Sequence, residues 1–214
     1  LAVCWVYRMR LWQVASTLHA PASQRFVCNL LIALLPAALL GFLLINLIKL
    51  HLFNPVAVAC AFIVGGLVIL WAEKREHDIT VQSVDDMTWR DALKVGFAQA
   101  LSLIPGTSRS GATIIGGLLF GFSRQAATEF SFFLAIPTML IATFYDVFNH
   151  RTLLSMDDLD IFAAGFISAF VFAMLAVRGL LAYIQRHDFT VFAWYRIVFG
   201  VLILLSAKLG WVNW

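Results

Sequence analysis

The chain has 214 residues, of which 62% are hydrophobic and 13% are charged, and its formal net charge is +3. Soluble domains are about 45–50% apolar and about 25% charged, so this composition excludes an ordinary soluble domain and indicates an integral membrane protein. The net charge is too small to suggest a nucleic-acid partner. The three cysteines are not spaced in pairs, so they indicate neither disulfides nor a metal site.

The N-terminal part of the sequence begins inside an apolar pattern. Leu1 is not a methionine, and residues 1–7 resemble the end of an apolar helix, so we expect a further segment to precede them. Residues 8–25 are polar to amphipathic. We treat residues 1–214 as a single integral membrane domain.

Five apolar stretches approach the ~20 residues that a helix needs to cross a bilayer. The predicted spans are 26–48, 55–72, 125–146, 160–180 and 190–212. Pro36 should kink the first of them. The pair Gly65-Gly66 should let the second pack closely against a neighbour.

Two shorter apolar segments lie between these spans. A long polar loop over 73–90 leads into a helix predicted over 89–104, and a second helix is predicted over 112–121. Neither is long enough to span comfortably, and Pro105-Gly106 separates them, which is typical of a re-entrant element. We therefore expect a hairpin, although the positive-inside rule favours it only slightly over a spanning pair. Both arrangements place the polar loop in the cytoplasm.

The break between the short helices carries the chemistry. Residues 105–111 read Pro-Gly-Thr-Ser-Arg-Ser-Gly, which places a permanent charge and three hydroxyls among lipid-depth residues. An ionisable group there costs roughly 2.5–3.5 kcal/mol on insertion scales. The cost is tolerable if the loop holds an anion, because Arg109 offers a forked donor set and a helix N-terminus offers free N–H groups. The sequence predicts a phosphate-binding loop.

Each residue of this loop also has an ordinary structural interpretation. Arg109 could pair with a carboxylate such as Glu129. Ser108 and Ser110 could bind phosphate, and one of them could be a nucleophile, but a serine before a helix is often an N-cap. Gly106, Thr107, Gly111 and Thr113 complete the predicted phosphate-binding set.

Several residues outside the loop keep two interpretations open. Glu129 either pairs with a basic residue and orients the loop, or is interfacial. Gln99 either hydrogen-bonds the loop or packs. Arg196 either snorkels or pairs with a buried acid. Gly117 and Gly121, four residues apart, indicate close helix packing.

Other nucleotide, metal and phosphatase motifs are absent from the sequence. It contains no Walker loop, no dinucleotide fingerprint and no paired His-Glu zinc motif. The five histidines show no metal-ligand spacing. The Pro-Ser-Gly-His element of type 2 lipid phosphatases is also missing.

The loop and its surroundings resemble a known family. The run from Pro105 to Ile114, the Gly116-Gly117 pair, the stretch Ser123–Pro137 and the Asp85-Asp86-Met-Thr sequence are similar to the undecaprenyl-diphosphate phosphatases, the bacitracin-resistance proteins. The similarity covers all 214 residues. It implies an all-α polytopic membrane protein with a re-entrant hairpin, part of an inverted-repeat architecture in the bacterial cytoplasmic membrane.

The resemblance also implies an activity and its residues. Family members hydrolyse undecaprenyl diphosphate to undecaprenyl phosphate and phosphate, which recycles the lipid carrier for peptidoglycan. By this resemblance Arg109 and Ser108 are catalytic, with Ser110 and Thr113 beside them. The family's first-repeat motif, with two glutamates, has no counterpart in this chain. We therefore expect the ligands of a divalent cation, Mg²⁺ or Ca²⁺, in a segment before Leu1, and no metal ligands within the chain.

Partners follow from the same resemblance. They are undecaprenyl diphosphate and the lipid bilayer, with a homodimer left open. The isoprenoid tail is expected between spans, beside Phe130, Phe132 and Phe133. The alternative function is a membrane transporter or lipid flippase, because transporters also combine broken helices with a midplane anion site.

Overall fold

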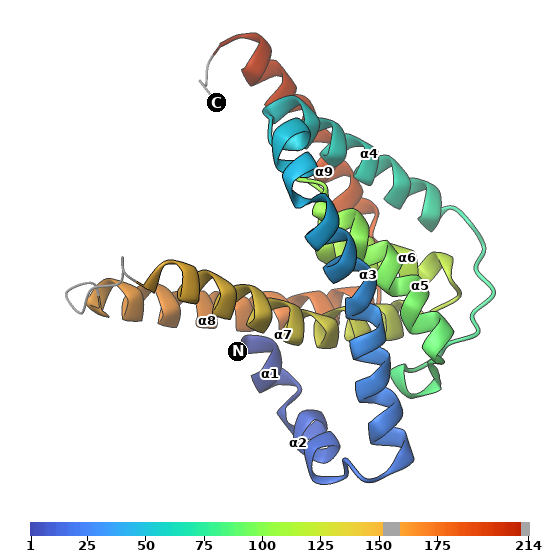
Figure 1. Cartoon of the computed structure of the whole chain (residues 1–214). Coiled ribbons are helices and arrows are strands. Elements are labelled where there is room, and N and C mark those ends of the chain that lie inside the picture. Colours follow the sequence, from blue (N-terminus) through green and yellow to red (C-terminus); the bar gives the residue numbers. More distant parts are fainter. Residues whose placement is uncertain (152–158, 211–214) are drawn as a thin grey trace.

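The computed structural model describes residues 1–151 and 159–210, and the described elements are helical (Figure 1). The helices are α1 Ala2–Val6, α2 Arg8–Ser16, α3 Pro21–Leu52, α4 Pro55–Glu73, η1 Val84–Asp86, α5 Trp89–Ala100, η2 Leu101–Leu103, α6 Arg109–Leu119, α7 Arg124–Asn149, α8 Leu159–Ile184 and α9 Thr190–Lys208. In Figure 1, α4 and α9 run alongside each other, α7 and α8 form a second arm, and α5 and α6 lie where the two meet.

The five predicted spans are confirmed as the five helices that are long and apolar enough to cross a membrane: α3, α4, α7, α8 and α9. α3 begins five residues earlier than predicted because Pro21 is well placed at the first position of a helix. α9 ends at Lys208, short of the predicted 212. Large apolar side chains such as Phe42 are widely exposed, as expected of a surface that faces lipid. The chain is a multi-pass membrane protein.

The pair α5–α6 forms the predicted hairpin, and both of its ends lie together. The backbone N–H of Val81 donates to the carbonyl of Gly121 at 3.1 Å, and the N–H of Ser123 donates to the carbonyl of Val81 at 2.9 Å. Val81 precedes α5 and Phe122 follows α6, so the chain enters and leaves the hairpin at the same place. A spanning pair would separate these residues by the thickness of the bilayer.

The sharp turn of the hairpin depends on Pro105 and Gly106. Ile104 is extended, as the residue before a proline prefers. Gly106 has a φ of +88°, and a Cβ there would lie 2.5 Å from the carbonyl oxygen of Val58. Only glycine allows both this conformation and the close approach to α4. The loop is therefore pressed against α4.

Glycines bring α4 and α9 into close contact, as the Gly65-Gly66 pair predicts. A Cβ on Gly66 would lie 2.7 Å from the carbonyl oxygen of Ala193, and one on Gly200 would lie 2.9 Å from that of Ala59. Gly117 likewise fits against Ala127 of α7. Gly121 differs from the prediction: its φ of +87° shows that it makes the turn after α6 rather than a helix contact.

The first half of α7 forms the core beneath the hairpin. Phe130 and Phe133 are 1% and 3% exposed, and Phe133 packs edge-on against Phe26 with ring centroids 5.1 Å apart. Phe132 contacts Tyr7. The prediction that these phenylalanines line a groove for a lipid tail is therefore wrong for the two buried rings, because neighbouring helices already cover them. Pro36 lies buried inside α3, and the predicted kink there remains a prediction.

The shared ends of the hairpin can be tested by thiol accessibility. In a cysteine-free background, Lys94→Cys and Gln125→Cys should react with a membrane-impermeant maleimide from the same side of sealed vesicles. Lys49→Cys, at the far end of α3, should react from the other side. Labelling of Lys94→Cys and Gln125→Cys from opposite sides would contradict the hairpin.

Candidate phosphate-binding site

The predicted phosphate loop leads directly into α6, and Ser108 caps that helix. The Ser108 hydroxyl accepts a hydrogen bond from the N–H of Gly111 at 3.1 Å and lies 3.3 Å from the hydroxyl of Ser110. Within the described part of the chain, the N–H groups of Arg109 and Ser110 have no acceptor. Capping and anion binding therefore coexist here: one N–H is satisfied by the serine, and two remain at the positive end of the helix dipole.

Arg109 is held by neutral groups only. Its Nε and Nη2 donate to the side-chain oxygen of Gln99 at 3.0 and 2.8 Å. Nη1 donates to the carbonyl of Ser131 at 3.1 Å, and Nη2 also reaches the hydroxyl of Thr138 at 3.4 Å. These four bonds leave one of the five guanidinium N–H donors without a described partner. The plane of the guanidinium is thus fixed while its charge is not neutralised.

The described residues do not support the interpretation of Arg109 as half of a salt bridge. Among residues 1–151 and 159–210, no carboxylate lies within 4 Å of its nitrogens. Glu129 accepts a hydrogen bond from Gln125 at 3.1 Å, and no basic nitrogen of the described residues lies within 4 Å of its carboxylate. Its predicted supporting role at the loop is not seen in the described geometry.

Arg196 of α9 is a second cation at the loop, and sequence reasoning placed it only as a snorkelling or acid-paired residue. It is 8% exposed, and its Nη2 donates at 3.1 Å to the carbonyls of Ala61 and Gly106. It packs over the ring of Phe62 at 4.9 Å. Neither predicted role holds in the described residues, because its contacts are carbonyls and a ring. Arg196 instead ties α9 and α4 to the loop.

Buried polar atoms without partners gather at this loop. Three are found among the described residues, and two of them are Nε2 of Gln99 and Nε of Arg196. Such an atom costs about 1–3 kcal/mol unless a ligand or water satisfies it. Gln99, 1% exposed, hydrogen-bonds the loop arginine as predicted. Both orphaned donors belong to side chains that hydrogen-bond residues 105–111.

The other predicted residues divide by exposure. Ser110 is exposed, Gly106, Thr107 and Gly111 are partly buried, and Thr113 is fully buried. The Thr113 hydroxyl pairs with that of Ser131 at 2.7 Å and donates to backbone carbonyls of its own helix. In this arrangement Thr113 braces α6 against α7, and its predicted contact with phosphate remains a prediction. Ser131 and Thr138, which sequence reasoning did not select, also support the site.

Metal-ligating side chains do not gather anywhere in the described residues. No group of three or more His, Cys, Asp or Glu side chains is close enough to hold a metal ion. The loop offers donors, namely guanidinium, hydroxyl and N–H groups, whereas a divalent cation requires oxygen acceptors. The residues around the loop therefore suit an anion and do not fit a cation.

Comparison with known proteins bears on the whole chain. Residues 1–202 match the family model described as bacitracin resistance protein BacA. A curated protein of Nitrosospira multiformis named undecaprenyl-diphosphatase is 61% identical over 215 residues, covering 100% of this chain and 79% of that protein. A protein of Laribacter hongkongensis with the same name is 63% identical, and the chain covers 79% of it. A protein of Rhodospirillum rubrum named undecaprenyl-diphosphatase 2 is 62% identical, and the chain covers 78% of it.

The role of the Arg109 charge can be tested by placing a carboxylate side chain beside the guanidinium. Gln99→Glu places a carboxylate of nearly the same shape against the guanidinium. The variant should stay folded, with an unchanged or raised Tm, and should bind inorganic pyrophosphate about tenfold more weakly or worse, a loss of about 1.4 kcal/mol. Calorimetric titration measures this. Gln24→Glu, an exposed site, is the control; equal binding by both variants would mean that Arg109 does not meet the anion.

Proposed function

This chain belongs to the family of bacitracin resistance protein BacA, and we propose that it hydrolyses undecaprenyl diphosphate with the terminal phosphate bound at residues 105–111. The names of the three relatives given above describe hydrolysis, and none describes transport, so they do not support the transporter alternative.

One observation carries the assignment of the site. Arg109 belongs to the loop, and Arg196, from a distant part of the chain, hydrogen-bonds the carbonyl of Gly106 in it. No described carboxylate neutralises either arginine. An uncompensated charge at low dielectric is costly unless an opposite charge arrives with the ligand. A diphosphate supplies that charge together with acceptors for free N–H groups. The site is then complementary to the anion and incomplete without it.

The reaction breaks the anhydride bond between the two phosphorus atoms of the substrate. A nucleophile attacks the terminal phosphorus, and the bridging oxygen leaves with the prenyl phosphate. Charge on the transferring group is stabilised by fixed donors. Arg109, oriented by Gln99, Ser131 and Thr138, supplies a guanidinium that needs no rearrangement. The α6 N-terminus supplies the N–H groups of Arg109 and Ser110, which have no acceptor among the described residues.

Further parts of the proposal rest on the family resemblance. A divalent cation, Mg²⁺ or Ca²⁺, would neutralise charge on the diphosphate when bound. No described residues form a site for it, so no step is assigned to it. The bacterial cytoplasmic membrane is the proposed location, recycling of the carrier for peptidoglycan the proposed role, and a homodimer the proposed assembly.

The forked donor set of Arg109 should be essential for turnover. Arg109→Lys keeps the charge but loses the planar fork that Gln99 orients, so kcat should fall about 100-fold or more, as for loss of one fixed transition-state donor. Phosphate release from undecaprenyl diphosphate by the complete gene product measures this. Arg90→Lys, an exposed position, is the control. Near-normal turnover by Arg109→Lys would remove Arg109 from catalysis.

The two serines should differ, with Ser108→Ala more harmful to turnover than Ser110→Ala. Ser108→Ala also removes the cap, at about 0.5–2 kcal/mol of stability, so a second variant is needed. Ser108→Asp keeps a capping oxygen but repels phosphate. It should fold normally, judged by its Tm, and release little phosphate. Active Ser108→Asp, or equal small effects of both alanine variants, would leave Ser108 as a cap alone.

A further inference from the structure

Glu73, the last residue of α4, carries a buried carboxylate that its own helix does not explain. Its side chain is 4% exposed, whereas the next three residues, Lys74, Arg75 and Glu76, are exposed. A buried carboxylate is costly unless partners satisfy it. A glutamate at the C-terminus of a helix also meets the negative end of the helix dipole. The position of Glu73 is therefore explained by what it contacts in other helices.

Both oxygens of this carboxylate bind other helices. One forms an ion pair with Nη2 of Arg124, the first residue of α7. The other accepts a hydrogen bond at 3.0 Å from the N–H of Phe189, which precedes α9. Arg124 lies at the positive end of the α7 dipole, an unfavourable place for a cation. Each charge thus opposes the dipole of its own helix, and the two stabilise each other across the junction of α4, α7 and α9.

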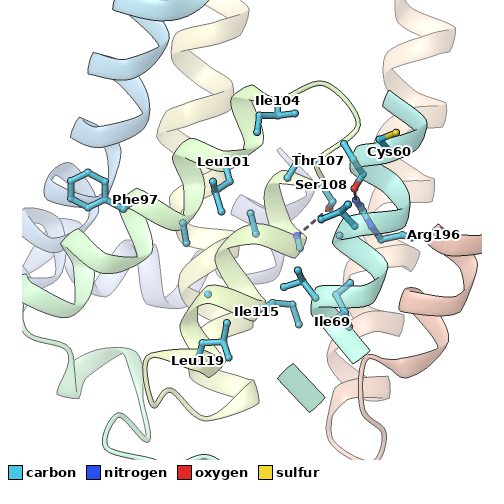
Figure 2. Close-up of a pocket in the computed structure, with 18 of the residues that line it drawn as sticks. Cys60, Ile69, Phe97, Leu101, Ile104, Thr107, Ser108, Ile115, Leu119 and Arg196 are labelled. Carbon is cyan, nitrogen blue, oxygen red and sulfur yellow. Dashed lines mark hydrogen bonds between the residues drawn. The ribbon is translucent and has the colours of Figure 1, made fainter. Parts of the chain in front are cut away.

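The helices α4 and α9 hold one side of the phosphate loop. Arg196 of α9 donates to the carbonyl of Gly106 at 3.1 Å, and Figure 2 shows its side chain near Thr107 and Ser108. A Cβ on Gly106 would lie 2.5 Å from the carbonyl oxygen of Val58, so α4 also contacts the loop closely. The placement of these two helices therefore sets where Arg196 lies.

The helix α7 holds the other side of the loop. The Ser131 carbonyl and the Thr138 hydroxyl accept from Arg109 at 3.1 and 3.4 Å. Within the described part of the chain, the pair of Glu73 and Arg124 is the only hydrogen bond or ion pair that joins α4 or α9 directly to α7. In Figure 1 these helices belong to the two arms that meet at the hairpin. The pair is thus placed to fix one arm against the other.

Glu73 acts at a distance from the phosphate loop. The helix α6 has 11 residues, which at 1.5 Å per residue places its two ends about 16 Å apart. Arg109 begins this helix, whereas Arg124 follows the turn at its far end. An effect of the Glu73 charge on the reaction therefore has to pass through the placement of the helices.

We propose that the pair of Glu73 and Arg124 positions the two arginines of the phosphate site by fixing α4 and α9 against α7. The proposal rests on the proposed function, in which Arg109 and Arg196 both lie at the bound phosphate. A displacement of about 1 Å, caused by a change far from the chemistry, costs about 100-fold in rate in the strongest cases. Glu73 is in this sense a positioning residue for the reaction.

Glu73→Gln removes the charge with little change of shape. Its amide oxygen still accepts from the Phe189 N–H, and Arg124, whose side chain is 44% exposed, turns to water, so the variant should fold. In the complete gene product, kcat for phosphate release from undecaprenyl diphosphate should fall about tenfold. KM should change less than about twofold, because the lipid chain binds elsewhere. Glu76→Gln, the same change at an exposed position, is the control and should change neither.

A double-mutant cycle separates positioning from stability. Arg124→Gln, alone and combined with Glu73→Gln, should lower kcat by the same factor of about ten, because each change breaks the same link. A loss of about 100-fold in the double variant would mean that the two residues act separately, which contradicts the proposal. A lowered Tm with normal kcat for the folded protein would leave the pair as a stabilising contact only, and also contradicts it.

Binding of inorganic pyrophosphate, measured by calorimetric titration on the same preparations, lets the two proposals fail separately. Glu73→Gln should bind it about threefold more weakly than the wild type does, a loss of about 0.7 kcal/mol. If the wild type releases no phosphate, the proposed function is wrong, and this difference in binding decides the positioning role. If the wild type is active and Glu73→Gln matches its kcat, the positioning role is wrong and the function stands.

Discussion

The structure depends on how the guanidinium of Arg109 is held between helices. Arg109 begins a short helix in an apolar part of the chain, and its donors are directed by an amide, a carbonyl and a hydroxyl from two other helices. These neutral acceptors set its orientation and leave its charge in place. A carboxylate at Gln99 would have stabilised the empty protein better, but would have cancelled the charge that an anion needs.

This constraint explains the shape of the surrounding fold. The hairpin has to turn sharply to present a helix N-terminus, which requires the left-handed Gly106, and the turn has to be pressed against α4. Glycines of α4 and α9 then bring Arg196 within reach of the same turn. Close packing, a broken helix pair and two arginines with no carboxylate partner among the described residues occur together around this turn, as the proposed anion site requires.

The sequence predicted the parts of this arrangement that local patterns encode. Apolar length predicted the spans, and Pro105-Gly106 predicted the hairpin. The phosphate loop, predicted from Arg109 among glycines and hydroxyls, stays a prediction. What it could not predict were contacts between distant segments. Arg196 lies 90 residues from the loop carbonyl it binds, and no local pattern connects them. Glu129 was considered as a partner because it lies in an apolar run of the sequence near the loop, but in the structure its carboxylate accepts from Gln125 instead.

The most direct test of the account is an experimental structure of the complete gene product with a non-hydrolysable prenyl methylenediphosphonate. The account predicts that oxygens of the terminal phosphonate lie within hydrogen-bonding distance of the Arg109 guanidinium and the Ser110 N–H. A diphosphonate bound away from residues 105–111, with Arg109 still contacting only Gln99, Ser131 and Thr138, would contradict it.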